Sequence, residues 1–192
     1  MTSIHIRRSV FETNSSSSHS LTVRERDLAQ MPFDEQTMRQ GVVYVSPDHY
    51  GWEWMRYYQP ANKIAYLLAQ ITGGDLEQGH MDSDEFTRFL CEQYPDLALI
   101  CQTVERHTGC IVQFQGGECG IDHESQGNGL QTLSDPVELE KLLFSPYSYI
   151  ETGNDNSSAP SSIQTDDGSS EPYHSPRSPE MVVKSNSRRP SF

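Results

Sequence analysis

Long hydrophobic runs are absent from this 192-residue sequence. No stretch approaches the roughly 18 consecutive apolar residues that a membrane-spanning helix needs. The first eight residues place no apolar run behind their charges, so a secretory signal peptide is not predicted either. These two absences make a cytoplasmic location, away from membranes, the expectation.

Basic residues are few. The chain has 27 acidic against 14 basic residues and a formal net charge of -13. The segment 157–192 holds four of each sign, so the whole excess of negative charge lies in residues 1–156. A surface of this sign repels phosphate backbones, so general nucleic-acid binding is not expected.

Cysteine is scarce and widely spaced. Eight or nine residues separate neighbouring cysteines, so no pair has the short gap of a zinc knuckle. In a reducing compartment the four are expected to act as small buried hydrophobic side chains, the alternative being a disulfide framework. They are Cys91, Cys101, Cys110 and Cys119.

Four motifs that mark large enzyme classes are also absent. The chain has no Gly-x-x-x-x-Gly-Lys loop, no Gly-x-Gly-x-x-Gly after a predicted strand, no His-Glu-x-x-His and no Gly-x-Ser-x-Gly. Their absence argues against P-loop ATPases, dinucleotide-dependent dehydrogenases, zincins and α/β-hydrolases. The sequence identifies no cofactor and assigns no set of metal ligands.

The elements that are present follow from hydrophobic periodicity. Helices are predicted at 61–71, from Asp82 to the break at Pro95, at 97–107 and after Ser134; strands are predicted at 4–6, 20–23, 42–45, 110–114 and 147–150. Residues 26–40 are ambiguous. This order predicts an α+β fold over residues 1–156: a single acidic domain with a small mixed or antiparallel sheet and about four helices.

Residues 157–192 differ in composition from the rest. Eleven of these 36 residues are Ser and five are Pro. Too little apolar surface is left to offset an ordering entropy of about 1–2 kcal/mol per residue. The composition therefore predicts a disordered, Ser/Pro-rich tail that begins at residue 157.

Five aromatic residues fall within nine positions: Tyr50, Trp52, Trp54, Tyr57 and Tyr58. Such a cluster fits core packing at one end of the domain. It also fits a stacking wall for a base or a sugar.

A first polar string, Glu12–Ser20, joins two predicted strands. Its candidate ligand-binding residues are Asn14, Ser15, Ser16, Ser17, Ser18 and Ser20, with His19 as a candidate catalytic residue. Hydroxyls and exposed backbone N–H groups in a tight turn can hold an anion without a lysine. His19 can carry a proton near neutral pH. The alternative is a hairpin turn whose side chains bond to their own backbone.

A second polar string, residues 122–125, follows a glycine-rich approach. Asp122 and Glu124 on one face of a strand could hold a divalent cation, or His123 could act as a base beside a carboxylate. The alternative is an acidic loop or edge strand.

A third polar string, residues 152–156, follows a strand rich in Tyr and Ile. Its residues Asn154, Asp155 and Asn156 suit either an ordinary hairpin turn or the grip of a sugar hydroxyl or metal.

The first string, Phe-Glu-Thr-Asn-Ser-Ser-Ser-Ser-His-Ser at residues 11–20, carries a resemblance. It resembles the opening of a group of small uncharacterised proteins from bacteriophages and some bacteria, which also carry an Asp-His-x-Ser and a Thr-Gly-Asn-Asp-Asn string. Those correspond to residues 122–125 and 152–156. The resemblance implies that the three strings form one unit, and host cytoplasm as the location if the chain is phage-encoded; it implies no activity.

Two functions are therefore hypothesised. In the first, the protein is a hydrolase or transferase acting on a phosphorylated or nucleotide-like small substrate. His19 or His123 would carry the proton, the serines would cradle the anion, and Asp122 and Asp155 would orient a histidine or bind a metal. In the second, it is a non-catalytic acidic protein that binds and modulates a host factor, presenting carboxylates where DNA phosphates would sit.

Overall fold

The computed structural model describes residues 3–6, 17–24, 27–121, 135–154 and 160–172, with the backbone alone at 3–6, 17, 18, 20 and 154. The helices are α1 (Glu35–Gln40), α2 (Pro60–Thr72), α3 (Ser83–Gln93), α4 (Pro95–Thr108) and α5 (Pro136–Phe144). The strands are β1 (Ser3–Ile6), β2 (Ser17–Arg24), β3 (Val42–Val45), β4 (His49–Tyr50), β5 (Met55–Tyr57), β6 (Ile111–Phe114), β7 (Gly120–Ile121), β8 (Tyr149–Asn154), β9 (Ser162–Thr165) and β10 (Ser170–Pro172).

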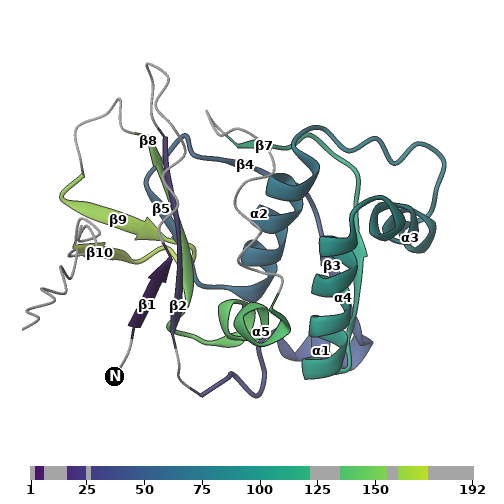
Figure 1. Ribbon diagram of the computed structural model, residues 1–192, viewed down its shortest axis with the longest axis horizontal. Helices are drawn as coiled ribbons and strands as arrows, with labels where there is room; N and C mark the ends of the chain where they lie inside the picture. Colours follow the sequence, from purple (N-terminus) through teal and green to yellow (C-terminus); the bar gives the residue numbers. More distant parts are fainter. Residues whose placement is uncertain (1–2, 7–16, 25–26, 122–134, 155–159, 173–192) are drawn as a thin grey trace, which may run out of the picture.

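The main sheet has six strands in the order β1-β2-β8-β5-β9-β10 (Figure 1). Its pairs are antiparallel except β5 with β9, which run parallel. Two small parallel pairs, β3 with β6 and β4 with β7, lie outside it. The predicted α+β class and mixed sheet are confirmed.

Local signals explain the helices. Asp82 and Glu85 form the capping box that the sequence predicts for α3. The α2 helix begins with Pro60 and ends at Gly73 in the left-handed region, with φ 70°. Pro95, expected to break the chain, instead occupies the first turn of α4, where its missing N–H costs no hydrogen bond. In the described residues α1 is a fifth helix, in the segment that the sequence left ambiguous.

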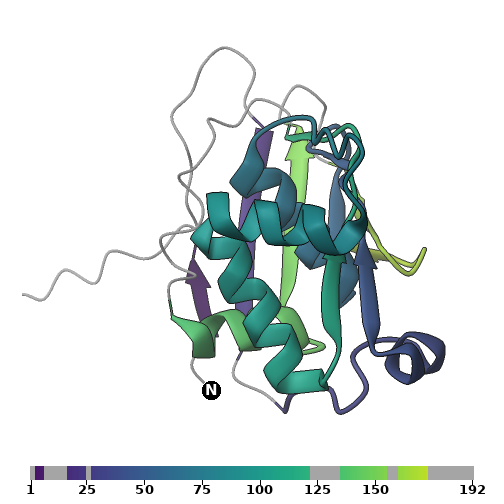
Figure 2. The same ribbon diagram turned by 90° about the vertical axis from the view of Figure 1, so that its right-hand side faces the viewer.

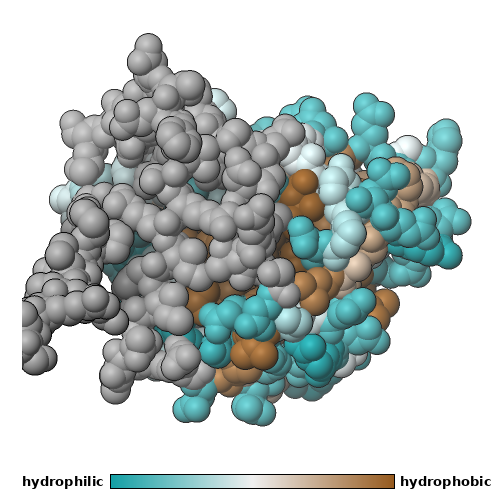
Figure 3. Space-filling model, viewed as in Figure 1, coloured by the Kyte–Doolittle hydropathy of each residue, from teal (hydrophilic) through white to brown (hydrophobic). Residues whose placement is uncertain are grey.

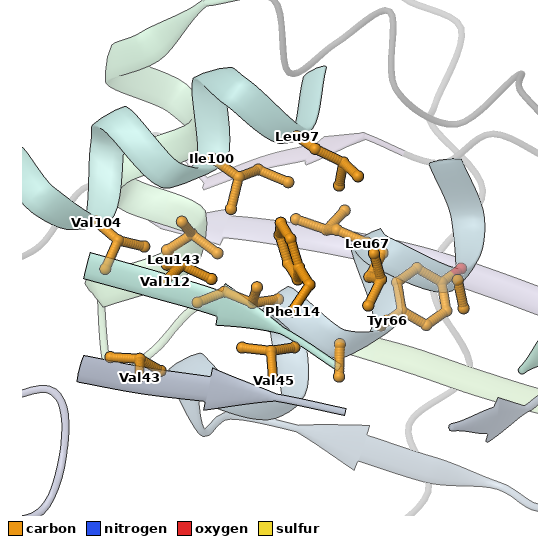
Figure 4. Packing of buried hydrophobic residues seen from close by; sticks show 14 of the residues in the cluster. Val43, Val45, Tyr66, Leu67, Leu97, Ile100, Val104, Val112, Phe114 and Leu143 are labelled. Atoms are coloured by element: carbon orange, nitrogen blue, oxygen red, sulfur yellow. The ribbon is translucent and has the colours of Figure 1, made fainter. Parts of the chain in front are cut away.

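The core lies between the main sheet and the outer helices. The α5 helix packs on β2, and α2 contacts α4, α5 and β3. Figure 2 shows α3 and α4 on the outer side, away from the main sheet. Phe114 lies at the centre of this core, among residues of α2, α4 and the β3–β6 pair (Figure 4). Packing of the buried α2 side chains in this core fixes the position of the helix.

The prediction that the tail is disordered is wrong for residues 160–172, because this segment contains β9 and β10. Ile163 and Thr165 are buried, and Glu171 pairs with Arg56 of β5. In the turn between the strands, Asp166 accepts hydrogen bonds from Gln59 N, at 2.6 Å, and from the Asn62 side chain, at the start of α2. Average composition missed this hairpin because so short a strand buries only two side chains. Residues 157–159 and 173–192 lie outside the described part.

Candidate functional site

The described parts of the first and third polar strings, residues 17–20 and 152–154, lie side by side. The β2 strand begins at Ser17, so Ser17–His19 belong to a strand and not to a turn. The β8 strand extends to Asn154, so the turn predicted from Thr152 is also wrong up to that residue. The two segments pair antiparallel: Ser17 with Asn154, Ser18 with Gly153, His19 with Thr152 and Ser20 with Glu151. Long-range pairing extends both strands beyond what their local composition favours.

His19 lies inside the protein, against α2. It is 8% exposed, and its Nδ1 lies 3.2 Å from the hydroxyl of Tyr66. That hydroxyl donates to Gln70 Oε1 at 3.3 Å. The contact between Tyr66 and His19 leaves the donor to be set by the tautomer of the imidazole, and it fixes the orientation of the ring.

The partners of His19 were not among the predicted site residues. Tyr66 and Gln70 are four residues apart on α2, hence on one face of the helix, and both are buried. Thr152, opposite His19, is also buried, and its hydroxyl donates to the Glu53 carbonyl at 3.3 Å. The polar residues on the apolar face of α2 were the sequence signal that could have identified these partners.

The second polar string, residues 122–125, lies outside the described residues, but the residue before it contacts the tyrosine cluster. Ile121, the last described residue before it, pairs with Tyr50, whose ring packs edge-on against Tyr66 with centroids 5.1 Å apart. In Figure 1, β7 and the end of β8 both lie at the upper end of the molecule. Three contacts, Ile121 with Tyr50, Tyr50 with Tyr66 and Tyr66 with His19, thus connect the end of the described segment to His19.

Several predicted site residues lie outside the described part of the chain: Asn14, Ser15, Ser16, Asp122, His123, Asp155 and Asn156. Among the described residues, no group of three His, Cys, Asp or Glu side chains could hold a metal ion. His19, Thr152 and the backbone of Ser17, Ser18, Ser20 and Asn154 therefore make up the described part of the site.

The aromatic cluster is divided between the core and the surface. Tyr50 is buried and packs edge-on against Tyr57, with centroids 5.3 Å apart. Burial raises the pKa of the Tyr50 hydroxyl above its ordinary value and does the same for Tyr57. Trp52 is 64% exposed. Tyr50 thus fits the interpretation of the cluster as core packing, whereas Trp52 offers an exposed ring on which a ligand could stack.

An ion-pair cluster lies on the opposite face of the sheet from His19, because neighbouring residues of a strand alternate in direction. Arg56 Nε donates to Glu151 Oε2 at 2.7 Å, and Nη1 donates to Glu171 Oε2 at 2.6 Å. The Arg56 guanidinium also lies over the Tyr149 ring, 4.9 Å from its centroid. Burial and the charge of Glu171 raise the pKa of Tyr58, which donates to Glu171, to about 12. The sequence contained no local signal for this cluster.

The Trp54 ring leaves no room for a side chain at Gly153. A Cβ atom at this position would lie 2.3–2.6 Å from three atoms of the Trp54 indole. We expect Gly153→Ala to lower the free energy of unfolding by about 2–3 kcal/mol, measured by urea denaturation. Gly74→Ala is the control, because a Cβ there meets nothing within 4 Å.

The clash also predicts coupling between the two residues. Trp54→Leu should relieve it, so the double variant should be more stable than the sum of the single losses implies. Additive losses would show that the ring does not set the requirement for glycine.

Comparison with family models, curated proteins and solved structures finds no match to this chain. No helix of the described residues is long and apolar enough to cross a membrane. Arguments about function therefore rest on the residues themselves.

Proposed function

We propose that the protein is a hydrolase or transferase that acts on a phosphorylated or nucleotide-like small substrate, with His19 as its proton carrier. The observation that carries the proposal is the register of β2 and β8, which brings the serine string alongside the Thr-Gly-Asn string with His19 opposite Thr152. Two segments over 130 residues apart in sequence thereby contribute polar groups to one place.

The Tyr66–Gln70 pair supports the role of His19. A base in an enzyme needs a fixed ring orientation and a defined tautomer, which a hydrogen bond to the other ring nitrogen supplies. Tyr66 meets His19 at Nδ1 and is itself held by Gln70. The imidazole of His19 thereby has the fixed orientation that a proton carrier needs.

The sheet edge supplies donors for an anion. In the described residues, the pairing of β1 with β2 ends at Leu21, while the pairing of β2 with β8 continues to Ser17. In an antiparallel strand alternate residues direct their N–H groups to opposite neighbours. Part of the backbone of residues 17–20 thus faces the side where β1 has ended. Backbone N–H groups there would bind a phosphate despite the acidic charge of the chain.

Substitution of His19 tests the proposal. Turnover of p-nitrophenyl phosphate and of a panel of nucleoside di- and triphosphates, with and without Mg²⁺, should identify an active substrate class for the full chain. His19→Gln should then lower kcat about 10²–10⁴-fold, the range for removing a general acid or base.

His80→Gln is the matched control, because His80 is exposed and lies in a turn far along the chain from β2. Its kcat should equal that of the wild type. Equal turnover by His19→Gln and the wild type would refute the role of His19. Absence of both turnover and ligand-induced thermal stabilisation across the panel would refute the enzyme proposal.

A non-catalytic acidic interaction protein is the second candidate, supported by the charge of the outer helices. Around α3 and α4 the exposed acidic residues are Asp82, Asp84, Glu85, Glu92, Asp96 and Glu105, against Arg88 and Arg106. Figure 3 shows mainly hydrophilic residues at the end of the molecule where α3 lies. Such a surface fits a basic host protein, whose binding should weaken steeply as salt rises.

A further inference from the structure

Two of the four cysteines face each other across the α3–α4 hairpin. Cys91 lies near the end of α3 and Cys101 in the middle of α4, and their sulfur atoms are 3.8 Å apart. Both are partly exposed, so the expectation of buried cysteines is wrong for this pair. Figure 2 shows that these two helices form the outer side of the molecule, where a reagent in solution can approach.

The other two cysteines differ in both respects. Cys110 and Cys119 are buried, as the sequence predicts, and each meets a partner that is not a thiol. Cys110 Sγ contacts Met38 Sδ at 3.8 Å, and Cys119 Sγ donates to the Gly74 carbonyl at 2.7 Å. The chain therefore contains an internal control for any reaction of its accessible thiols.

The hydrogen bond between the paired thiols makes them unequal. It lowers the pKa of Cys91, whose thiolate accepts the bond, and raises the pKa of Cys101, which keeps its proton. Since the thiolate is the nucleophile in thiol chemistry, Cys91 is the thiol that attacks first and Cys101 the one that resolves.

We infer that Cys91 and Cys101 form a thiol pair that a low-molecular-weight disulfide oxidises to an intramolecular disulfide bond. A disulfide has an S–S length of about 2.05 Å, so each sulfur must move by about 1 Å, within the reach of small side-chain rotations. This modification site is independent of the proposed enzymatic function, because it lies on the opposite side of α2 from the main sheet.

The reaction balances with oxidised glutathione as the oxidant. The Cys91 thiolate attacks one sulfur of glutathione disulfide, forming a mixed disulfide and releasing one glutathione thiolate. Cys101 then loses its proton to solvent and attacks the Cys91 sulfur, which breaks the mixed disulfide and releases the second glutathione. Two protein thiols are oxidised by two electrons, and one glutathione disulfide is reduced to two thiols.

The cross-link joins two helices that already pack against each other. It closes a loop of 11 residues, 91–101. Restricting so short a loop in the unfolded chain should raise Tm by about 5 °C if the native helices stay in place.

The test is to incubate the full-length protein with oxidised glutathione and count free thiols in denaturant. Four thiols should fall to two, and dithiothreitol should restore four. Trypsin cleaves after Arg88 and Arg106, so both cysteines lie in one tryptic peptide. That peptide should become two hydrogen atoms lighter, and its fragmentation should locate the bond between Cys91 and Cys101.

Two variants separate this site from general thiol oxidation. Cys110→Ser should still lose two thiols, whereas Cys101→Ser should stop at a mixed disulfide of Cys91 with glutathione. Retention of all four thiols in the wild-type protein would overturn the inference. So would a bond mapped to Cys110 or Cys119, or a mixed disulfide that persists while Cys101 is present.

Discussion

Arg56→Met is expected to lower the free energy of unfolding by about 3–5 kcal/mol. Arg56 and Glu151 are both buried and paired, and within the described residues Glu151 Oε1 meets no hydrogen-bond partner. Burial opposes the charge on Arg56, but the bond and charge of Glu151 more than offset this and raise its pKa above the ordinary value. Without Arg56, Glu151 would be a buried carboxylate with no counter-charge. Urea denaturation at neutral pH measures the loss.

A second substitution tests whether the unpaired carboxylate of Glu151 causes the loss of stability. Arg56→Met combined with Glu151→Leu should recover much of the loss, because a hydrophobic pair can replace a buried ion pair at little cost. Arg39→Met is the surface control, since its pair with Glu35 is exposed and should contribute less than about 0.5 kcal/mol. A double variant as unstable as Arg56→Met would show that packing, and not the unpaired charge, causes the loss.

The helices could be predicted because their signals are local. The apolar stripe of α2 and the Asp82–Glu85 capping box of α3 each lie within a few turns of chain. The α1 helix has no buried residue, so it offered no apolar stripe to detect. Helices were predicted correctly where apolar residues recur at helical spacing and so mark the buried face.

The extents of the strands could not be predicted because pairing is not local. Serine, glycine and asparagine are typical of turns, yet Ser17–His19 and Thr152–Asn154 are extended because each pairs with the other. The β9 strand likewise depends on β5, more than 100 residues earlier. The sequence singled out His19 and the polar strings as a candidate site, but nothing near His19 in sequence indicates that it contacts Tyr66, which bonds to Gln70.

The buried polar residues of α2 link the fold to the candidate site. Tyr66 and Gln70 contact the site, and Lys63, one turn earlier than Tyr66, is completely buried. Lys63 Nζ donates to the carbonyls of Leu142, Leu143 and Ser145, at 2.9, 3.2 and 3.4 Å. The Leu142 and Leu143 carbonyls lie in the last turn of α5, where a helix lacks its own donors, and the Ser145 carbonyl also accepts from Ser148 N at 3.1 Å; Lys63 thus caps the carboxyl end of α5. Since α5 packs on β2, this cap supports the strand that carries His19.

Lys63→Met should therefore lower the free energy of unfolding by about 3 kcal/mol, because it removes the buried donor of the Leu142 and Leu143 carbonyls while keeping the volume of the side chain. Arg88→Met is the control: Arg88 is exposed on α3, so its loss should change the free energy of unfolding by less than about 1 kcal/mol. Equal losses in the two variants would show that Lys63 does not act as a cap.

The same lysine predicts how stability changes with pH. Burial lowers the pKa of Lys63 to about 7, with the Asp166 charge opposing the shift, against an ordinary value of 10.5. Between these values the unfolded chain binds the proton and the folded chain releases it, so stability rises with pH. The wild type should gain about 2 kcal/mol between pH 7 and 9 relative to Lys63→Met, which lacks the group. Parallel urea titrations measure this gain, and a difference that stays constant over that range would mean that the three carbonyls keep Lys63 protonated.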